Sequence, residues 1–168
     1  ATAMLDVLKI GNPCMAYPLA TIIWIPPLAE IFRQNGTPLD FAPYIKGPTA
    51  CGKSVTAGFA LSAYGNMDKH SFPASFRDTV ASTEQTFATL KDALCVIDDY
   101  HPRSPSEQRS MDALADSIVR MVADGNVRNR FKQDSPRPQA FVVATGETIP
   151  SIAASGLSRY LFIECNAH

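Results

Sequence analysis

Eight consecutive residues carry the clearest chemical pattern in the chain. They are Gly47, Pro48, Thr49, Ala50, Cys51, Gly52, Lys53 and Ser54, which fit the pattern GxxxxGK followed by Ser or Thr. In this pattern the glycines let backbone N–H groups wrap a phosphate, the lysine neutralises β- and γ-phosphate oxygens, and the hydroxyl reaches Mg²⁺. A helix beginning near Lys53 adds its positive N-terminal end. The pattern therefore predicts a site for a nucleoside triphosphate and Mg²⁺.

Two acidic residues, Asp98 and Asp99, end the apolar run at 93–97. A phosphate loop needs a carboxylate on a neighbouring strand end to hold Mg²⁺, directly or through water, and we expect Asp98 to do this with Ser54. Asp99 is then expected to orient or deprotonate the attacking water, a task for which many such ATPases use the longer glutamate. The alternative for an isolated Asp-Asp pair is a polar strand end or a helix cap. The order of loop and acids favours the catalytic interpretation.

Two further positions are candidates for contact with a γ-phosphate. Thr145 closes the apolar run 140–145. Where a strand lies between the loop strand and the acidic strand, a polar residue at its tip faces the γ-phosphate, so Thr145 is the candidate sensor and Glu147 a less favoured substitute. An ordinary turn residue beside Gly146 is the alternative. Arg159 precedes the last predicted strand, where a ring-forming ATPase presents a cation to a neighbouring subunit; a solvated surface arginine is the alternative.

Residues 120–137 are basic within a chain of formal net charge −1. Five basic residues outnumber two acidic ones there, and turn signals at 125–126 and 135–136 predict a protruding hairpin or loop. Such a projection suits phosphate contacts along a nucleic-acid backbone, with Phe131 available for stacking. A solvated charged loop fits the composition equally well.

The composition is that of one globular domain, with 168 residues, 46% hydrophobic and 18% charged. The four cysteines form no CxxC pair, which indicates free thiols and a cytoplasmic location. The three histidines have no metal-binding spacing; His101 follows the acidic pair, where a capped loop histidine is favoured over a site contact.

The most apolar run, 15–32, is interrupted by prolines and predicts a buried helix pair, not a membrane span or a signal peptide. Because the chain opens at Ala1 without a methionine, we expect a fragment of a longer protein.

The elements that must position these residues alternate between strand and helix. Strands are predicted at 41–46, 71–76 (weakly), 93–99, 140–145 and 160–164, and helices at 55–64, 79–91 and 106–123. This order predicts an α/β fold, a three-layer P-loop NTPase with a mostly parallel five-stranded sheet. A helical lead-in at 1–36 is expected to pack on an ATPase core at 37–168.

Taken together, these motifs resemble an AAA+ type ATPase, and more narrowly the ATPase cores of phage and mobile-element replication proteins related to superfamily 3 and MCM helicases. The resemblance spans about 38–164 and rests on GPTACGKS at 47–54, the stretch 79–102, RMVADGNVRNRF at 120–131, FVVATGE at 141–147 and LSRYLFIE at 157–164. The first motif is specific for nucleotide binding, and the others are individually weak and persuade by their order.

The resemblance implies a hexameric ring of identical subunits that hydrolyses ATP with Mg²⁺ and pulls single-stranded DNA through its pore. It places DNA contacts on Arg128, Arg130 and Lys132 and an arginine finger on Arg159. Two departures are Asp99 in place of the commoner glutamate and the lack of a lid domain or second sensor after the last strand.

The first functional prediction is therefore an ATP-hydrolysing motor domain of a DNA helicase or translocase. A small-molecule P-loop kinase and a nucleotide-gated switch with little turnover remain the alternatives. A GTPase is disfavoured because the sequence has no NKxD guanine-reading motif.

Overall fold

A parallel five-stranded sheet forms the middle layer of the chain. The computed structural model describes residues 13–65, 70, 72–124 and 140–166. The strand order is β2-β3-β4-β1-β5, and every pairing is parallel. The strands are β1 (Ala42–Lys46), β2 (Ala74–Ser75), β3 (Leu94–Tyr100), β4 (Phe141–Gly146) and β5 (Tyr160–Glu164). This arrangement confirms the predicted α/β class.

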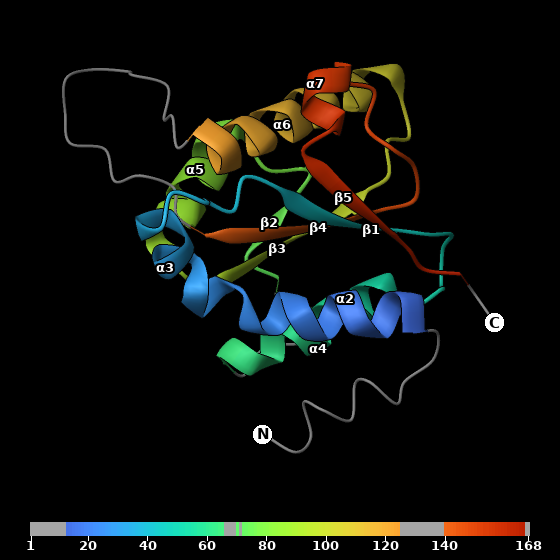
Figure 1. Cartoon of the computed structure of the whole chain (residues 1–168). Helices are drawn as coiled ribbons and strands as arrows, with labels where there is room; N and C mark the ends of the chain where they lie inside the picture. The colour runs from blue at the N-terminus through green and yellow to red at the C-terminus, as the bar shows by residue number, and fades with distance from the viewer. Residues whose placement is uncertain (1–12, 66–69, 71, 125–139, 167–168) are drawn as a thin grey trace, which may run out of the picture.

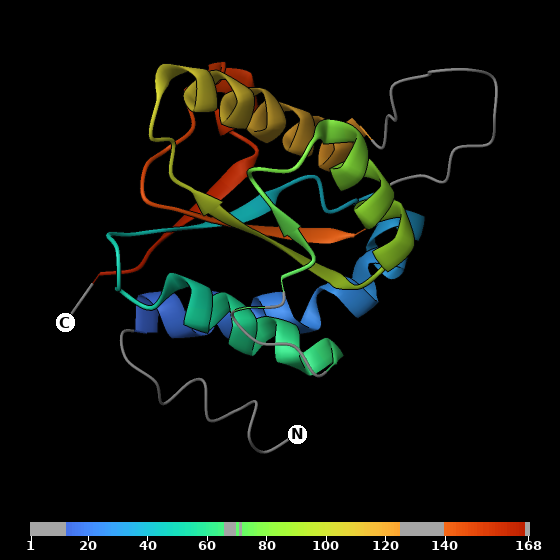
Figure 2. The same ribbon diagram turned by 180° about the vertical axis from the view of Figure 1, so that it is seen from behind.

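Helices cover both faces of this sheet, which gives the predicted three layers (Figures 1 and 2). One face carries α2 (Pro13–Trp24) and α4 (Lys53–Leu61), and the other carries α5 (Val80–Leu90), α6 (Pro105–Asp124) and the short α7 (Ala154–Leu157). Shorter segments are the 3-10 turns η2 (Pro26–Leu28) and η3 (Ser62–Tyr64) and the helix α3 (Ala29–Gln34).

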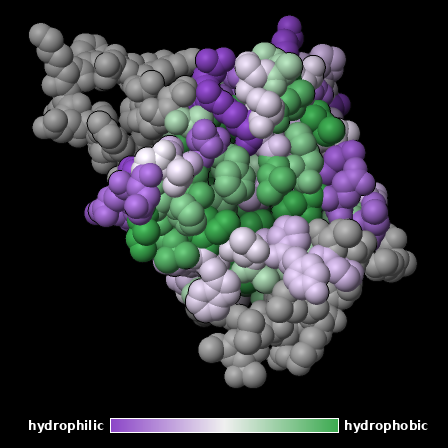
Figure 3. Space-filling view, in the orientation of Figure 1, coloured by the Kyte–Doolittle hydropathy of each residue, from purple (hydrophilic) through white to green (hydrophobic). Residues whose placement is uncertain are grey.

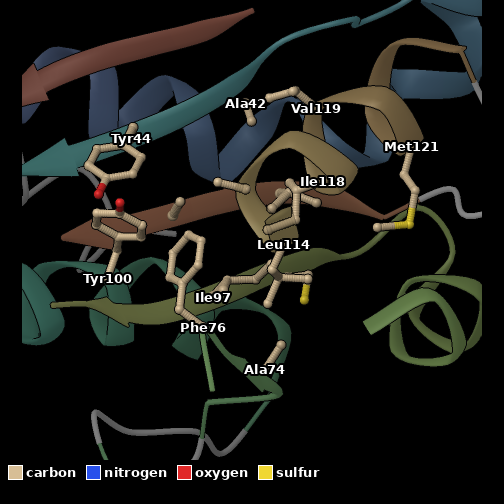
Figure 4. Close-up of a cluster of buried hydrophobic side chains, with 14 of the residues drawn as sticks. Ala42, Tyr44, Ala74, Phe76, Ile97, Tyr100, Leu114, Ile118, Val119 and Met121 are labelled. Atoms are coloured by element: carbon tan, nitrogen blue, oxygen red, sulfur yellow. The ribbon is translucent and has the colours of Figure 1, made fainter. Parts of the chain in front are cut away.

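Successive side chains along each strand point to opposite faces of the sheet, so each face has its own hydrophobic core. On β3, Leu94 and Val96 pack with α2 and α4, whereas Cys95 and Ile97 pack with α6. The second of these cores, which Figure 4 shows from β1 across to α6, is closed by Tyr100. Strands buried on both faces read as continuous apolar runs, and this explains why the pattern was visible in sequence.

Strand β4 lies between the loop strand and the acidic strand. Its Ala144 pairs with Tyr44 of β1 on one side and with Ile97 of β3 on the other. The insertion required for the interpretation of Thr145 is therefore present.

The N-terminal helices differ from the predicted buried pair. The α2 helix buries Ala16, Leu19, Ile22 and Ile23, but α3 buries no residue. Tyr17, Trp24, Leu28, Ile31 and Phe32 remain exposed. Figure 3 shows hydrophobic side chains gathered across the middle of the side of the molecule that is seen in Figure 1. The prediction was thus right for α2 and wrong for α3, because a short helix after Pro26-Pro27 leaves the core.

No single helix among the described residues has the length and apolar composition of a membrane span, although the bent pair Met15–Trp24 and Pro26–Gln34 meets those two criteria. Two smaller differences concern the core: the weak strand at 71–76 shrinks to the two residues of β2, and α7 was not predicted.

Candidate functional site

The phosphate-binding motif forms the turn between β1 and α4, as predicted. A Cβ on Gly47 would lie 2.2 Å from the carbonyl oxygen of Cys165, so this position accepts only glycine. Gly52 has φ +96°, which side chains rarely adopt, and Ala50 also lies in the left-handed region at φ 64°. The backbone is therefore folded into a tight loop that ends at the first turn of α4.

Lys53 holds this loop together from within. Its Nζ donates hydrogen bonds to the carbonyl oxygens of Gly47 (2.8 Å) and Pro48 (2.7 Å), and the side chain is 9% exposed. An ammonium has three donors: these two bonds fix its place, and its contact with Cys51 Sγ is a long one, at 4.0 Å. A positive charge at the N-terminus of α4 favours a phosphate.

The two predicted metal ligands meet beside the lysine. Ser54 Oγ, on α4, donates to Asp98 Oδ1, on β3, at 3.1 Å. Thr145 Oγ1, on β4, donates to the same carboxylate oxygen at 2.5 Å. Parallel strands end at a common edge of a sheet, and this brings residues far apart in sequence to one carboxylate.

Asp99 takes a different direction from Asp98. Its backbone is left-handed at φ 68°, where the register of β3 against β4 shifts, and its N–H donates to Thr145 Oγ1 at 3.2 Å. Its Oδ2 lies 3.5 Å from Nη2 of Arg77, and both side chains are about half exposed. The predicted water-activating carboxylate thus sits at the rim of the site in an ion pair.

Glu147 has a larger place in the site than its sequence ranking suggested. Its carboxylate accepts a hydrogen bond from Thr49 Oγ1 in the phosphate loop, and its Oε2 lies 2.9 Å from His101 Nδ1. The hydrogen bond from Thr49, aided by the charges of His101 and Lys53, lowers the pKa of Glu147. The sequence signals for this cluster of Thr49, His101 and Glu147 were weak. They were a glutamate soon after the apolar strand and a histidine after the acidic pair.

These groups line one cleft of about 170 Å³ at the carboxyl edge of the sheet. Its walls are Thr49, Ala50, Lys53, Ser54, Asp98, Asp99, Thr145, Gly146 and Glu147. Seven of the nine are predicted site residues, and Glu147 was the substitute sensor. Gly47, Pro48, Cys51 and Gly52 complete the loop behind this wall.

A magnesium ion fits the donors of this cleft in kind. Mg²⁺ binds oxygen, and proteins usually supply one or two carboxylates while water and substrate phosphates complete the shell. Ser54 and Asp98 are such donors. The described residues contain no cluster of three or more His, Cys, Asp or Glu side chains, so a bound ion would depend on the nucleotide for its remaining ligands.

Arg159 lies outside this cleft, at the opposite edge of the sheet. It directly precedes β5, which starts beside α7, and its carbonyl accepts the N–H of Ala42 at the start of β1 (Figure 1). Its surroundings include Asp116 and Arg120 of α6 in a small hollow of about 70 Å³. Arg128, Arg130 and Lys132, the predicted DNA contacts, lie outside the described residues.

Comparisons with known proteins agree with this architecture. No protein-family model matches the chain, and no curated protein matches it. Among solved structures, an active helicase from SCCmec type IV (Cch) aligns over 96% of this chain and 30% of its own, with a TM-score of 0.58 and 20% identity. The JCV helicase aligns over 98% of this chain and 44% of its own, with a TM-score of 0.59 and 15% identity.

The fold is helicase-like. At these identities the likeness concerns the fold alone, and the chain spans less than half the length of either helicase. The P-loop NTPase class inferred from sequence is thereby confirmed, whereas the narrower resemblance to superfamily 3 and MCM helicases stays a prediction.

Proposed function

We propose that this chain is the ATP-hydrolysing motor core of a DNA helicase or translocase, acting in the replication of a phage or mobile element. One observation carries the proposal: Lys53, Ser54, Asp98 and Thr145 converge on one cleft at the carboxyl edge of the sheet. The helicase-like fold and the order of the sequence motifs support it.

The loop and the helix behind it bind the triphosphate. Backbone N–H groups of residues 49–54 would surround the phosphates, and Lys53 adds a charge that is already held in place by two carbonyl oxygens. Because this side chain is largely buried, its attraction for a phosphate is weakly screened by solvent.

Ser54 and Asp98 would hold magnesium, and the ion would supply positive charge beside the phosphate oxygens. Thr145 shares its hydroxyl between Asp98 and the N–H of Asp99. It therefore couples the orientation of the metal-binding carboxylate to that of the neighbouring acid. Asp99 accepts the proton of the attacking water once its carboxylate leaves the exposed ion pair with Arg77.

The second half of the hydrolytic site comes from another copy of the chain in a ring, most simply a hexamer. Arg159 presents its guanidinium to the γ-phosphate held by that neighbour, and Arg128, Arg130 and Lys132 contact single-stranded DNA. The position of Arg159 away from its own cleft supports this division of labour.

A nucleotide-gated switch with little turnover is the second candidate. It is favoured by the ion pair that holds Asp99 at the rim of the cleft. In that case Arg77→Ala is expected to raise a very low basal turnover, whereas in the motor it leaves the DNA-stimulated rate within about twofold, since an exposed pair contributes little.

The decisive experiment measures ATP turnover against protein concentration, with and without single-stranded DNA. The motor predicts a steep rise with concentration and stimulation by DNA. Replacing Arg128 and Arg130 together by alanine is expected to weaken DNA binding and to lower its salt dependence by about 1.4 in log–log slope, roughly 0.7 per lost phosphate contact. Turnover that needs a small-molecule acceptor and ignores DNA would make the chain a kinase instead.

A further inference from the structure

Two thiols from distant parts of the chain meet directly beneath the phosphate loop. Cys165 follows β5, and its Sγ donates to the backbone carbonyl oxygen of Cys51 at 3.0 Å. Burial, followed by a hydrogen bond to the Cys51 side chain, raises the pKa of the Cys165 thiol to about 11. The contact joins positions 114 residues apart and has no role in the proposed hydrolysis.

The surroundings of this pair hold it in place. The N–H of Cys165 donates to the carbonyl of Lys46 at 2.7 Å, which fixes the end of β5 against the residue that precedes the loop. A Cβ on Gly47 would lie 2.7 Å from Cys51 Sγ, so the sulfur is wedged against the loop backbone. The fold therefore holds both cysteines next to each other before any reaction.

The two thiols differ in access and in chemistry. Cys165 is buried, whereas Cys51 is partly exposed and its Sγ lies 4.0 Å from the ammonium of Lys53. The raised pKa keeps the Cys165 thiol protonated, so the two thiols differ chiefly in how easily a solute reaches them. An oxidant in solution therefore reaches the Cys51 sulfur first. The Cys165 thiol is placed to react with the oxidised Cys51.

We propose that Cys51 and Cys165 form a reversible redox modification site that is oxidised by hydroperoxides and controls the phosphate loop. The Cys51 sulfur attacks one peroxide oxygen, the O–O bond breaks, and Cys51 becomes a sulfenic acid; the other oxygen leaves as hydroxide and is converted to water by the proton that the Cys51 thiol gives up. The Cys165 sulfur then attacks Cys51 Sγ; the S–S bond forms, the S–O bond breaks, and the oxygen leaves as water with the Cys165 proton. Two thiols lose two electrons, and one hydrogen peroxide becomes two waters.

Oxidation has a structural consequence for the loop. A disulfide holds its two sulfurs about 2.05 Å apart, where the Cys165 thiol now contacts the Cys51 carbonyl oxygen, and Cys165 is tied to Lys46 through its backbone. The contraction must therefore move the Cys51 segment, whose N–H groups are needed for phosphate. A displacement of about 1 Å in such a site is known to cost up to roughly 100-fold in activity, and we expect ATP affinity to fall about tenfold or more.

The first test concerns the linkage and is independent of nucleotide binding. The 168-residue chain is treated with hydrogen peroxide and digested without reduction, and the peptides are identified by mass spectrometry. We expect a peptide pair that links Cys51 to Cys165 and disappears with dithiothreitol.

Cys165→Ala should instead accumulate a sulfenic acid at Cys51 that dimedone traps. Cys95→Ala, which removes a buried thiol from the other core, should form the linkage normally. A folded wild-type protein that forms no linkage, or that links Cys14 or Cys95 instead, would overturn the proposal.

The second test concerns control of the loop, and it rests on the proposed nucleotide site. Binding of a fluorescent ATP analogue is measured before oxidation, after oxidation and after reduction. We expect reversible loss in the wild type and little change in Cys165→Ala, with circular dichroism confirming that both remain folded. A linkage that forms without changing affinity would refute control of the loop. If the reduced protein binds no ATP analogue, the proposed function fails, and the linkage test still decides the modification site.

Discussion

The two edges of the sheet are built from the same five strands, yet they differ in what one chain supplies. At the carboxyl edge, side chains from α4, β3 and β4 meet within hydrogen-bonding distance around Asp98. At the amino edge, Arg159 is placed beside α6 and α7, and the strand that follows it is five residues long, about 16 Å. An arginine side chain does not span that length.

The difference teaches which parts of the proposed site are local to one chain. Parallel strands bring their C-terminal residues to one edge of the sheet, whatever the distance between them in sequence. The phosphate loop and the two aspartates, Asp98 and Asp99, therefore come together within a single chain. A residue that precedes a strand is carried to the other edge by the same geometry. Arg159 can therefore serve catalysis only in another copy's cleft, and the alternative is a structural role next to Asp116 and Arg120.

The largest effect is expected from Lys53→Ala at the carboxyl edge. The change removes a mostly buried charge that donates to Gly47 and Pro48, and loss of a charge-assisted bond of about 3 kcal/mol weakens ATP binding roughly 100-fold. Turnover should become undetectable. Isothermal titration calorimetry with ATP measures the affinity, and Lys46→Ala, which removes the charge one residue before the loop, is the matched control. Equal losses in both variants would show that the cleft does not bind the phosphates.

Arg159→Ala should have the next largest effect, and only on turnover. An arginine supplied in trans is worth about 10³-fold or more in rate, whereas ATP binding to the intact cleft stays within about twofold. Arg120→Ala is the control, because Arg120 shares the same hollow and pairs with Asp116 at 2.8 Å. It should keep nearly full turnover.

A mixing experiment sharpens this prediction. Lys53→Ala and Arg159→Ala are each expected to be inactive, but in the proposed ring some clefts would combine an intact loop with an intact arginine. Turnover should therefore return when the two variants are mixed in equal amounts. Absence of any recovery in mixed oligomers would mean that Arg159 does not act across the subunit boundary.

The contrast between the two edges also explains which parts of the fold and of the site could be predicted from the sequence. The loop, the acidic strand and Thr145 were predictable because each is a local pattern: glycines and a lysine at fixed spacing, or apolar runs buried on both faces. The order of the strands in the sheet, β2-β3-β4-β1-β5, was not predicted and comes from the structure. The α/β layering was predictable from the same local patterns, and the parallel sheet confirms it.

Contacts between distant residues had no comparable signal. The Thr49–Glu147 hydrogen bond joins positions 98 residues apart, and the Cys51–Cys165 contact joins positions 114 apart. Asp99 shows the same limit, since its left-handed backbone and its turn toward Arg77 depend on a register shift against β4. Spacing along the chain says which residues reach the edge, but packing across strands decides where each side chain points.

The smallest effect is expected from Glu147→Gln, which probes how the rim of the carboxyl edge holds the loop. The pKa of Glu147 is lowered in the folded state, so its stabilisation is present above the ordinary pKa of a glutamate, about 4.3, and is lost as the pH falls through the folded value. The side chain is 26% exposed, so its bonds to Thr49 and His101 contribute at most about 1 kcal/mol.

Urea unfolding of Glu147→Gln and wild type at several pH values checks this expectation. The variant should be less stable at pH 7, and the difference should shrink as the pH falls below about 4.3 and vanish once the pH is below the lowered pKa of Glu147. Glu164→Gln, which removes an exposed carboxylate paired with Lys46 at 3.6 Å, should change stability less. A pH-independent difference would mean that Glu147 acts through packing, and the loop would then be held by Lys53 and Cys165 without help from the rim.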